Sequence, residues 1–138
     1  MAIAYFESLT DCDVIELDII ASENQPIPTR LFVDSGFTGA SCLILPEEYR
    51  RFSLATIMAS QASGALQGRQ DRILLTCRIP SLSFERNVIA VATDVSSLSL
   101  PSGVDGMVGL SFLRQFERWG AERTRVGSWR FFVADNIE

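Results

Sequence analysis

Short apolar runs separated by turn-forming residues dominate the chain. Runs rich in β-branched residues predict strands at Asp13–Ile20 and Thr29–Val33, and the polar, proline-containing turn between them favours a hairpin with a long loop. Further strands are predicted at Ile73–Ile79, Asn87–Thr93 and Ser128–Ala134. The apolar pattern is therefore that of a mainly β chain.

Two short helices interrupt this pattern. Pro46–Arg51 has proline and acidic residues in its first turn and arginines in its last, which is typical of a short helix. Leu110–Trp119 places its apolar residues on roughly one face and predicts a second helix. The middle of residues 53–70 is made of small residues, with no large apolar side chain in 59–65, so we expect a mobile loop or hairpin tip at 59–65.

The chain has 138 residues, which fits a single domain over residues 1–138. Many short strands with one or two short helices predict a mainly β fold, either a sandwich or a closed barrel. A hydrophobic fraction of 47% is normal for a chain with a real core. No apolar run is long enough to span a membrane, and no basic region precedes an apolar run at the N-terminus, so we predict a cytoplasmic protein without membrane association.

Charge and composition exclude several classes of chemistry. The net charge is −5, and the arginines near the C-terminus are mixed with glutamates, so we expect a solvated face and no nucleic-acid partner. Three widely separated cysteines argue against a disulfide framework or a cysteine-based zinc site. The chain has no histidine, which removes Ser-His-Asp and Cys-His catalysis. We predict no metal and no cofactor.

The segment Leu31–Ala40 carries the candidate chemistry. Its apolar strand runs directly into Asp34-Ser-Gly, which places a carboxylate at the end of a rigid element. Asp, Ser and Gly are also ordinary turn residues, so the tripeptide alone favours a turn over catalysis, and its context is what points to chemistry. Gly36 lets the backbone pass close by and offers an unobstructed N–H to the carboxylate, and the Ser35 hydroxyl can brace the loop.

Two motifs together resemble the retropepsin-like (retroviral-type, clan AA) aspartic proteases. Val33–Gly39 is similar to the Asp-Thr/Ser-Gly loop of that family, and with the following Leu43–Pro46 it is similar to its small bacterial and archaeal single-domain members. Val104–Leu113 resembles the segment of two hydrophobic residues and a glycine that packs beneath this loop in the family. The resemblance implies a closed, barrel-like fold, and the two motifs occur in the expected order.

The resemblance also implies site residues. Asp34 matches the catalytic aspartate, with Ser35, Gly36 and Thr38 supporting the loop. Ser63 and Gly64 match the flap by position and composition. The segment beneath the loop corresponds to three consecutive residues, Met107, Val108 and Gly109. The chain departs from the family's pattern at Phe37, where many members carry a small residue. It also departs at residues 118–138, which extend past the second helix and bear on how a dimer forms.

The implied function is that of an aspartic endopeptidase acting on peptide or protein substrates. Such chemistry needs two carboxylates that share a proton and activate a water between them. The chain contains one Asp-Ser-Gly triplet, so a homodimer with one Asp34 from each copy completes the site most simply. Two alternatives remain open: a non-catalytic dimeric peptide-binding or adaptor domain, and a structural β domain in which Asp34 only caps a turn.

Overall fold

β-strands make up most of the regular structure in the computed structural model, which describes residues 2–38, 43–62 and 68–135. In chain order, the strands are β1 (Ala2–Glu7), β2 (Val14–Ile20), β3 (Pro26–Val33), β4 (Leu43–Pro46), β5 (Ala55–Ala62), β6 (Gly68–Ile79), β7 (Phe84–Thr93), β8 (Gly106–Val108), β9 (Arg118–Arg123) and β10 (Trp129–Asp135). The helical elements are α1 (Leu110–Leu113) and the 3-10 helices η1 (Ser22–Asn24), η2 (Glu47–Phe52), η3 (Pro80–Leu82) and η4 (Ser96–Leu98). No helix within these ranges is long and apolar enough to cross a membrane.

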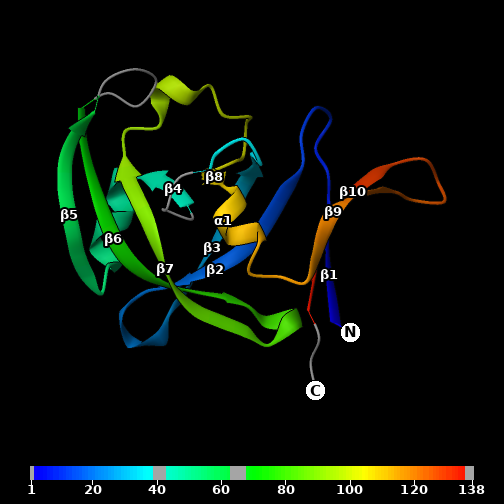
Figure 1. Cartoon of the computed structure of the whole chain (residues 1–138), viewed down its shortest axis with the longest axis horizontal. Helices are drawn as coiled ribbons and strands as arrows, with labels where there is room; N and C mark the ends of the chain where they lie inside the picture. The colour runs from blue at the N-terminus through cyan, green and yellow to red at the C-terminus, as the bar shows by residue number, and fades with distance from the viewer. Residues whose placement is uncertain (1, 39–42, 63–67, 136–138) are drawn as a thin grey trace.

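The strands close into a barrel (Figure 1). Hydrogen-bonded neighbours follow the order β2-β3-β8-β4-β7-β6, and β2 then pairs with β6 through Asp18 opposite Arg78 and Ile19 opposite Cys77. This last pairing closes the ring, while β5 continues the sheet on the other side of β6. The prediction of a mainly β, closed barrel with only short helices is confirmed.

Alternating side chains along the strands fill the barrel. On β6, Ile73, Leu75, Cys77 and Ile79 are buried, while the residues between them are at least partly exposed. This period of two is what a strand with one face on a core requires. The predicted strands at 13–20, 29–33, 73–79, 87–93 and 128–134 are all present, with boundaries shifted by no more than five residues; the largest shift is at the start of β6.

The second predicted helix is shorter than the pattern indicated. Leu110–Trp119 was expected to be helical, but α1 ends at Leu113 and Trp119 lies in β9. Phe112 and Phe116 pack against Phe84 with ring centroids 5.9 and 4.9 Å from it, so the apolar spacing is satisfied by a turn that leads into a strand. The first predicted helix is present as η2, in the 3-10 form.

The small residues 59–65 were expected to form a mobile loop or a hairpin tip; residues 59–62 belong to a hairpin, and residues 63–65 lie outside the described residues. Residues 55–62 form β5, and they pair with the first part of β6 in an antiparallel hairpin. Main-chain hydrogen bonds hold a strand pair whatever the size of the side chains, so small residues did not prevent pairing here.

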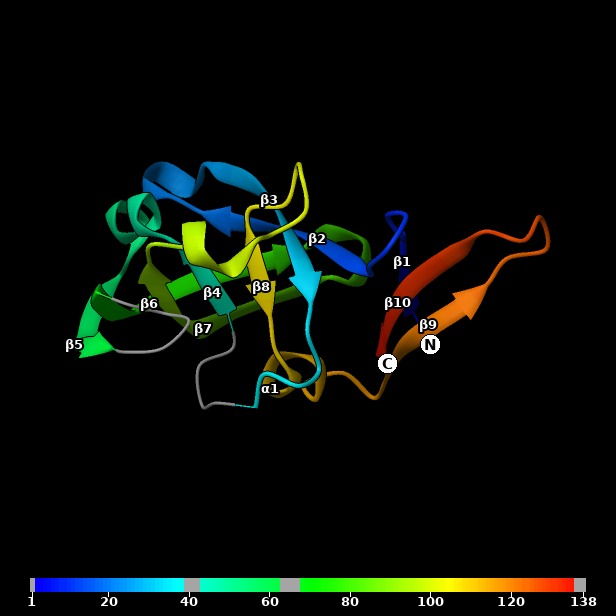
Figure 2. The same cartoon turned by 90° about the horizontal axis from the view of Figure 1, so that it is seen from above.

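A second sheet lies beside the barrel and contains a strand that the sequence did not reveal. β1, at the N-terminus, pairs with β10, and β10 pairs with β9. In Figure 2 this sheet stands apart from most of the barrel, and the β9–β10 hairpin projects outward. The residues beyond the α1 region therefore form a sheet with the start of the chain.

Tyr49 on η2 generates a prediction about alkaline stability. Its hydroxyl lies 3.1 Å from Thr29 Oγ1, and both residues are buried. The pKa of Tyr49 is raised, mainly by burial of its side chain. The negative charges of Asp105 and Glu48 raise this pKa further, and the hydrogen bond with Thr29 lowers it in part. A raised pKa in the folded state means that the folded chain retains a proton that the unfolded chain releases. The free energy of unfolding should therefore be unaffected by this group below about pH 10, and should fall as the pH rises above that value.

Comparing the wild type with Tyr49→Phe by denaturant unfolding across this alkaline range tests the prediction. The variant should lose stability with a shallower slope, and the chain has no lysine to obscure the comparison. Equal slopes for the two proteins would contradict it.

Candidate active site

Asp34 lies at the point where β3 leaves the barrel. β3 runs parallel to β8, with Val33 opposite Val108, and the backbone N–H of Asp34 donates to the carbonyl oxygen of Val108 at 3.0 Å. On its other side, the N–H of Val33 donates to the carbonyl oxygen of Asp13 at 2.9 Å. The carboxylate is thus attached to backbone that is held from two directions.

The loop after Asp34 folds back on the carboxylate. Gly36 donates its N–H to Asp34 Oδ1 at 3.0 Å, and Phe37 donates its N–H to the Asp34 carbonyl oxygen at 3.1 Å. Asp34 is half-buried, while Ser35, Gly36 and Thr38 are exposed. Within the part of the chain that the structure describes, Asp34 Oδ2 has no hydrogen-bond partner. One carboxylate oxygen is thus held by the loop backbone, and the other is left without a partner among the described residues.

Gly109 fits against this loop because it lacks a side chain. A Cβ at Gly109 would lie 2.6 Å from Phe37 Cδ2 and 2.7 Å from the Phe37 carbonyl oxygen. The next residue, Leu110, donates its N–H to that same oxygen at 2.9 Å. The Val108-Gly109-Leu110 segment therefore contacts the loop through its backbone.

β8 is clamped on its other edge by β4. Leu43 lies opposite Val108 in an antiparallel pair, and Ile44 lies opposite Met107. A Cβ at Gly106 would overlap the backbone carbonyl of Ile44, so glycine is required for this close approach. The three residues predicted to lie under the loop, Met107, Val108 and Gly109, thus run from the centre of β8 to the start of α1, directly beside Asp34.

Other carboxylates near β3 are engaged. Asp105 Oδ2 accepts the backbone N–H of Arg30 at 2.9 Å, and the Asp105 N–H donates to the Arg30 carbonyl oxygen at 2.8 Å. Asp13 Oδ1 accepts the Ser8 hydroxyl at 2.7 Å. These side chains fasten β8 and the β1–β2 connection.

The predicted flap residues Ser63 and Gly64 lie outside the described residues. The β5–β6 hairpin from which they would extend is described up to Ala62 and from Gly68. The end of β5 and the loop after β3 lie toward the same side of the molecule in both views, the upper part of Figure 1 and the lower part of Figure 2.

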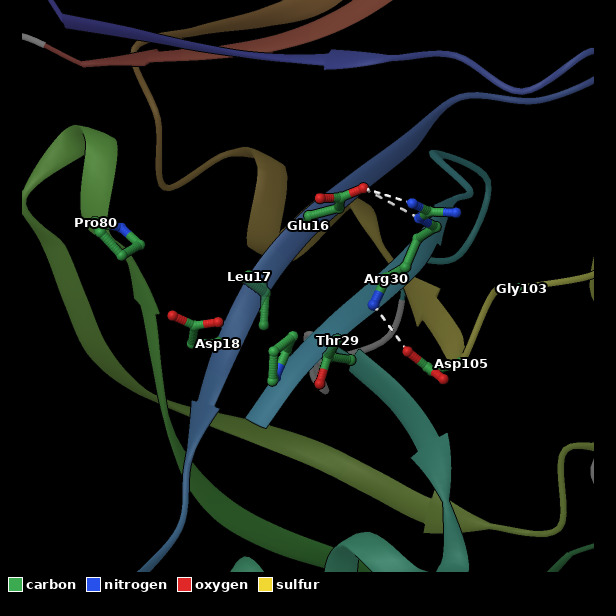
Figure 3. A pocket seen from close by; sticks show the side chains of 9 residues that line it. Glu16, Leu17, Asp18, Thr29, Arg30, Pro80, Gly103 and Asp105 are labelled. Carbon is green, nitrogen blue, oxygen red and sulfur yellow. Dashed lines mark hydrogen bonds and ion pairs between the residues drawn. The ribbon is translucent and has the colours of Figure 1, made fainter. Parts of the chain in front are cut away.

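A cavity of about 420 Å³ lies elsewhere, on the outer side of the β2–β3 pair (Figure 3). Arg30 bridges its rim, with Nη2 donating to Glu16 Oε1 at 2.9 Å, and Asp105 closes the other side. Asp34 does not line this cavity. Of the charged groups of the cavity, Glu16 pairs with Arg30 and Asp105 bonds backbone, while the Asp18 carboxylate has no partner among the described residues. We assign the candidate chemistry to the Asp34 loop because the two motifs singled out in the sequence meet there.

Within the described ranges, no group of three or more histidine, cysteine, aspartate or glutamate side chains is arranged to hold a metal ion. The fold and the site therefore define a mainly β barrel that presents one braced carboxylate.

Comparison with known proteins gives a likeness in structure and none in sequence. No family model matches the chain, and a search of curated proteins finds no match. Among solved structures, the chain is similar to the EIAV protease complexed with the inhibitor HBY-793, at 15% identity and a TM-score of 0.41. The similarity covers 80% of this chain and 92% of that chain. At this distance, the role of each residue has to come from the geometry of this chain itself.

Sequence reasoning missed one charged pair. Arg50 on η2 forms an ion pair with Asp71 on β6, and Asp71 is 1% exposed. In the alternating strand β6, Asp71 occupies the same inward-facing positions as Ile73 and Leu75. This spacing of two residues was the signal that could have identified Asp71 as a buried acidic residue.

Gly109→Ala tests the contact between α1 and the Asp34 loop. The added methyl group must displace Phe37, so we expect a loss of about 1–3 kcal/mol in the free energy of unfolding, as for other overpacked sites. Hydrogen exchange at the amides of Gly36 and Phe37 should become faster. Gly120→Ala is the matched control, because its Cβ would lie 3.6 Å from Phe132 Cε1, an ordinary contact distance. A Gly109→Ala protein as stable as this control would refute the described packing.

Proposed function

We propose that the chain is a retropepsin-like aspartic endopeptidase, in which Asp34 from each of two copies forms the catalytic pair. The observation that carries the proposal is the Asp34 carboxylate itself: Oδ1 is held by the Gly36 N–H, Oδ2 is open, and the backbone is fixed to Val108. A reactive group held on rigid elements, with one face available to substrate, is what positioned catalysis requires.

A second copy supplies what one chain lacks. Hydrolysis of a peptide bond by carboxylates needs one group as base and another as acid. Of the described carboxylates near β3, Asp13 accepts the Ser8 hydroxyl, and Asp105 bonds Arg30 at the other end of the β3–β8 pair from Asp34. A two-fold axis that brings two Asp34 loops together provides the second carboxylate with the same geometry as the first.

In the proposed reaction, the two Asp34 carboxylates share one proton, because like charges a few ångströms apart do not both ionise readily. The ionised member takes a proton from a water molecule as the water oxygen attacks the peptide carbonyl carbon. The protonated member donates to the carbonyl oxygen, and proton transfer to the nitrogen then releases the amine. The exposed hydroxyl of Ser35 would brace one loop against the other, as the resemblance implies, and no cofactor takes part.

The same proposal extends to the rest of the chain. Residues 1–138 form a single catalytic domain, similar to the small bacterial and archaeal members of the family. An extended peptide is the substrate, bound beneath a flap formed by the β5–β6 hairpin, with the tip at Ser63 and Gly64. An extended substrate matches a site built from strand ends, because its backbone can add to neighbouring strands.

Asp34→Asn tests the catalytic role. We expect wild type to cleave members of a diverse peptide mixture somewhere between about pH 4 and 7, and the variant to lose at least about a thousandfold in kcat/KM. Glu48→Gln, at an exposed position, removes the same charge and should leave cleavage unchanged. Cleavage that survives in Asp34→Asn would refute the role of Asp34. A folded, dimeric wild type that cuts nothing would favour the peptide-binding or adaptor function instead.

Mixing experiments test the requirement for two copies. When wild type is mixed with an equal amount of Asp34→Asn and the chains exchange, only about a quarter of the dimers carry two Asp34 residues, so activity per wild-type chain should fall to about half. Excess Asp34→Asn should suppress activity further, and dilution should lower specific activity together with the dimer fraction measured by sedimentation. Activity per wild-type chain that stays the same on both mixing and dilution would show that one chain is enough for catalysis.

A further inference from the structure

The β5–β6 hairpin leaves the barrel at Asp71. From Asp71 to Ile79, β6 pairs with β7, beginning with Asp71 opposite Ala92. Asp71 also lies opposite Ala59 of β5. Before Asp71, residues 68–70 pair only with residues 60–62 of β5. Asp71 is therefore the last position at which three strands lie side by side, and the hairpin continues beyond it as two strands.

Asp71 is also unusual in its burial. Among the residues whose exposure the structure describes, it is the one buried charged side chain, at 1% exposure. A buried charge is costly unless it is paired, so its position in the chain calls for a physical reason. Ile73 and Leu75, which follow it on the same face, are ordinary core residues.

Its partner comes from a different element. Arg50 Nε contacts Asp71 Oδ2, and Arg50 Nη2 also bonds Glu47 Oε1 at 3.3 Å. The Arg50 Nε–H is not aligned for a hydrogen bond, so the contact with Asp71 is an ion pair. Arg50 belongs to η2, which follows directly from β4, the strand that clamps β8 under the Asp34 loop.

Backbone bonds reinforce the same connection. Leu54 donates its N–H to the Leu74 carbonyl oxygen at 2.8 Å, and the Ser53 hydroxyl bonds the Ala55 carbonyl oxygen at 2.6 Å. The chain therefore passes from η2 into β5 while attached to β6. Two-stranded ribbons are only marginally stable alone, so the contacts at the root of this hairpin decide how its strands are held.

We propose that the Arg50–Asp71 ion pair sets the position of the β5–β6 hairpin relative to the Asp34 loop, and that both residues are positioning residues for binding of the peptide. This inference rests on the proposed function for its consequence in catalysis. The physical link runs from the hairpin root through Asp71 and Arg50 to η2, then through β4 to β8 and the loop. Neither residue needs to touch the reacting atoms.

The test compares Asp71→Asn with Glu85→Gln. Glu85 pairs with Arg78 at 2.5 Å near the other end of the β6–β7 ladder, where Glu85 is exposed, so the control removes one charge and one ion pair far from the hairpin root. In Asp71→Asn we expect KM for a peptide cleaved by wild type to rise about tenfold, with kcat changed less than about twofold. Hydrogen exchange at the amides of β5 and of residues 68–71 should become about tenfold faster in this variant alone.

Two Arg50 variants distinguish loss of the ion pair from a general folding defect. Arg50→Gln should reproduce the rise in KM. Arg50→Lys keeps the positive charge, so its KM should be much closer to that of wild type. If Asp71→Asn does not fold, as judged by circular dichroism, these two variants carry the test. A general loss of structure would lower kcat and accelerate exchange throughout the barrel, which the proposal does not expect.

The outcomes separate the two proposals. If wild type cleaves peptides and Asp34→Asn does not, unchanged KM and exchange in Asp71→Asn and Arg50→Gln would overturn the role of the ion pair alone. If wild type cleaves nothing, the proposed function falls, and the role in peptide binding falls with it. Faster exchange confined to the hairpin would then show only that the ion pair holds the two strands.

Discussion

The structure around the candidate site depends on the parallel pairing of β3 with β8. This pairing places the Asp34 N–H against the Val108 carbonyl oxygen and brings Gly109 onto Phe37. Parallel neighbours need a long connection, and here almost the whole middle of the chain, from β4 to β7, lies between the two strands. β8 lies between β3 and β4, and β4 in turn pairs with β7, so the short Asp34 loop is held by strands from both halves of the chain.

Closure of the barrel by β2 and β6 has a related consequence. The two strands share only the positions Asp18–Arg78 and Ile19–Cys77, so a short ladder joins the ends of the sheet. β6 serves three neighbours along its length: β5 and β7 near Asp71, and β2 near its end. A long strand lets one element both close the barrel and support a hairpin that extends beyond it, which explains why one polar group at the point where the hairpin leaves the barrel can matter to two parts of the molecule.

The sequence predicted local features well and connections poorly. Alternation in Ile73–Ile79 and the run into Asp34 identified strands, because a half-buried strand imposes a period of two on its residues. The order of the Asp34 and Val108 motifs suggested their contact, which the structure places in one ladder. Sequence could not show that residues 55–62 form a strand, because the hydrogen bonds come from β6 and leave no mark on the small side chains. The predicted helix at 110–119 was too long for a similar reason. Arg118–Arg123 pairs with β10, and this distant partner overrides the helical spacing of the apolar residues.

The terminal sheet bears on how two copies can meet. β1 pairs with β10 of its own chain along Ala2–Glu7, so the backbone groups of β1 on that side are already bonded within one copy. Ser8 continues this ladder by donating its N–H to the Trp129 carbonyl oxygen at 3.1 Å. A dimer that interleaves the chain ends would have to break these bonds first, at the cost of a complete strand pair. Contacts between the exposed Asp34 loops require no such exchange, because Ser35, Gly36 and Thr38 already face outward. In the proposed dimer, the two Asp34 loops would therefore meet directly, with the terminal sheet remaining part of each copy.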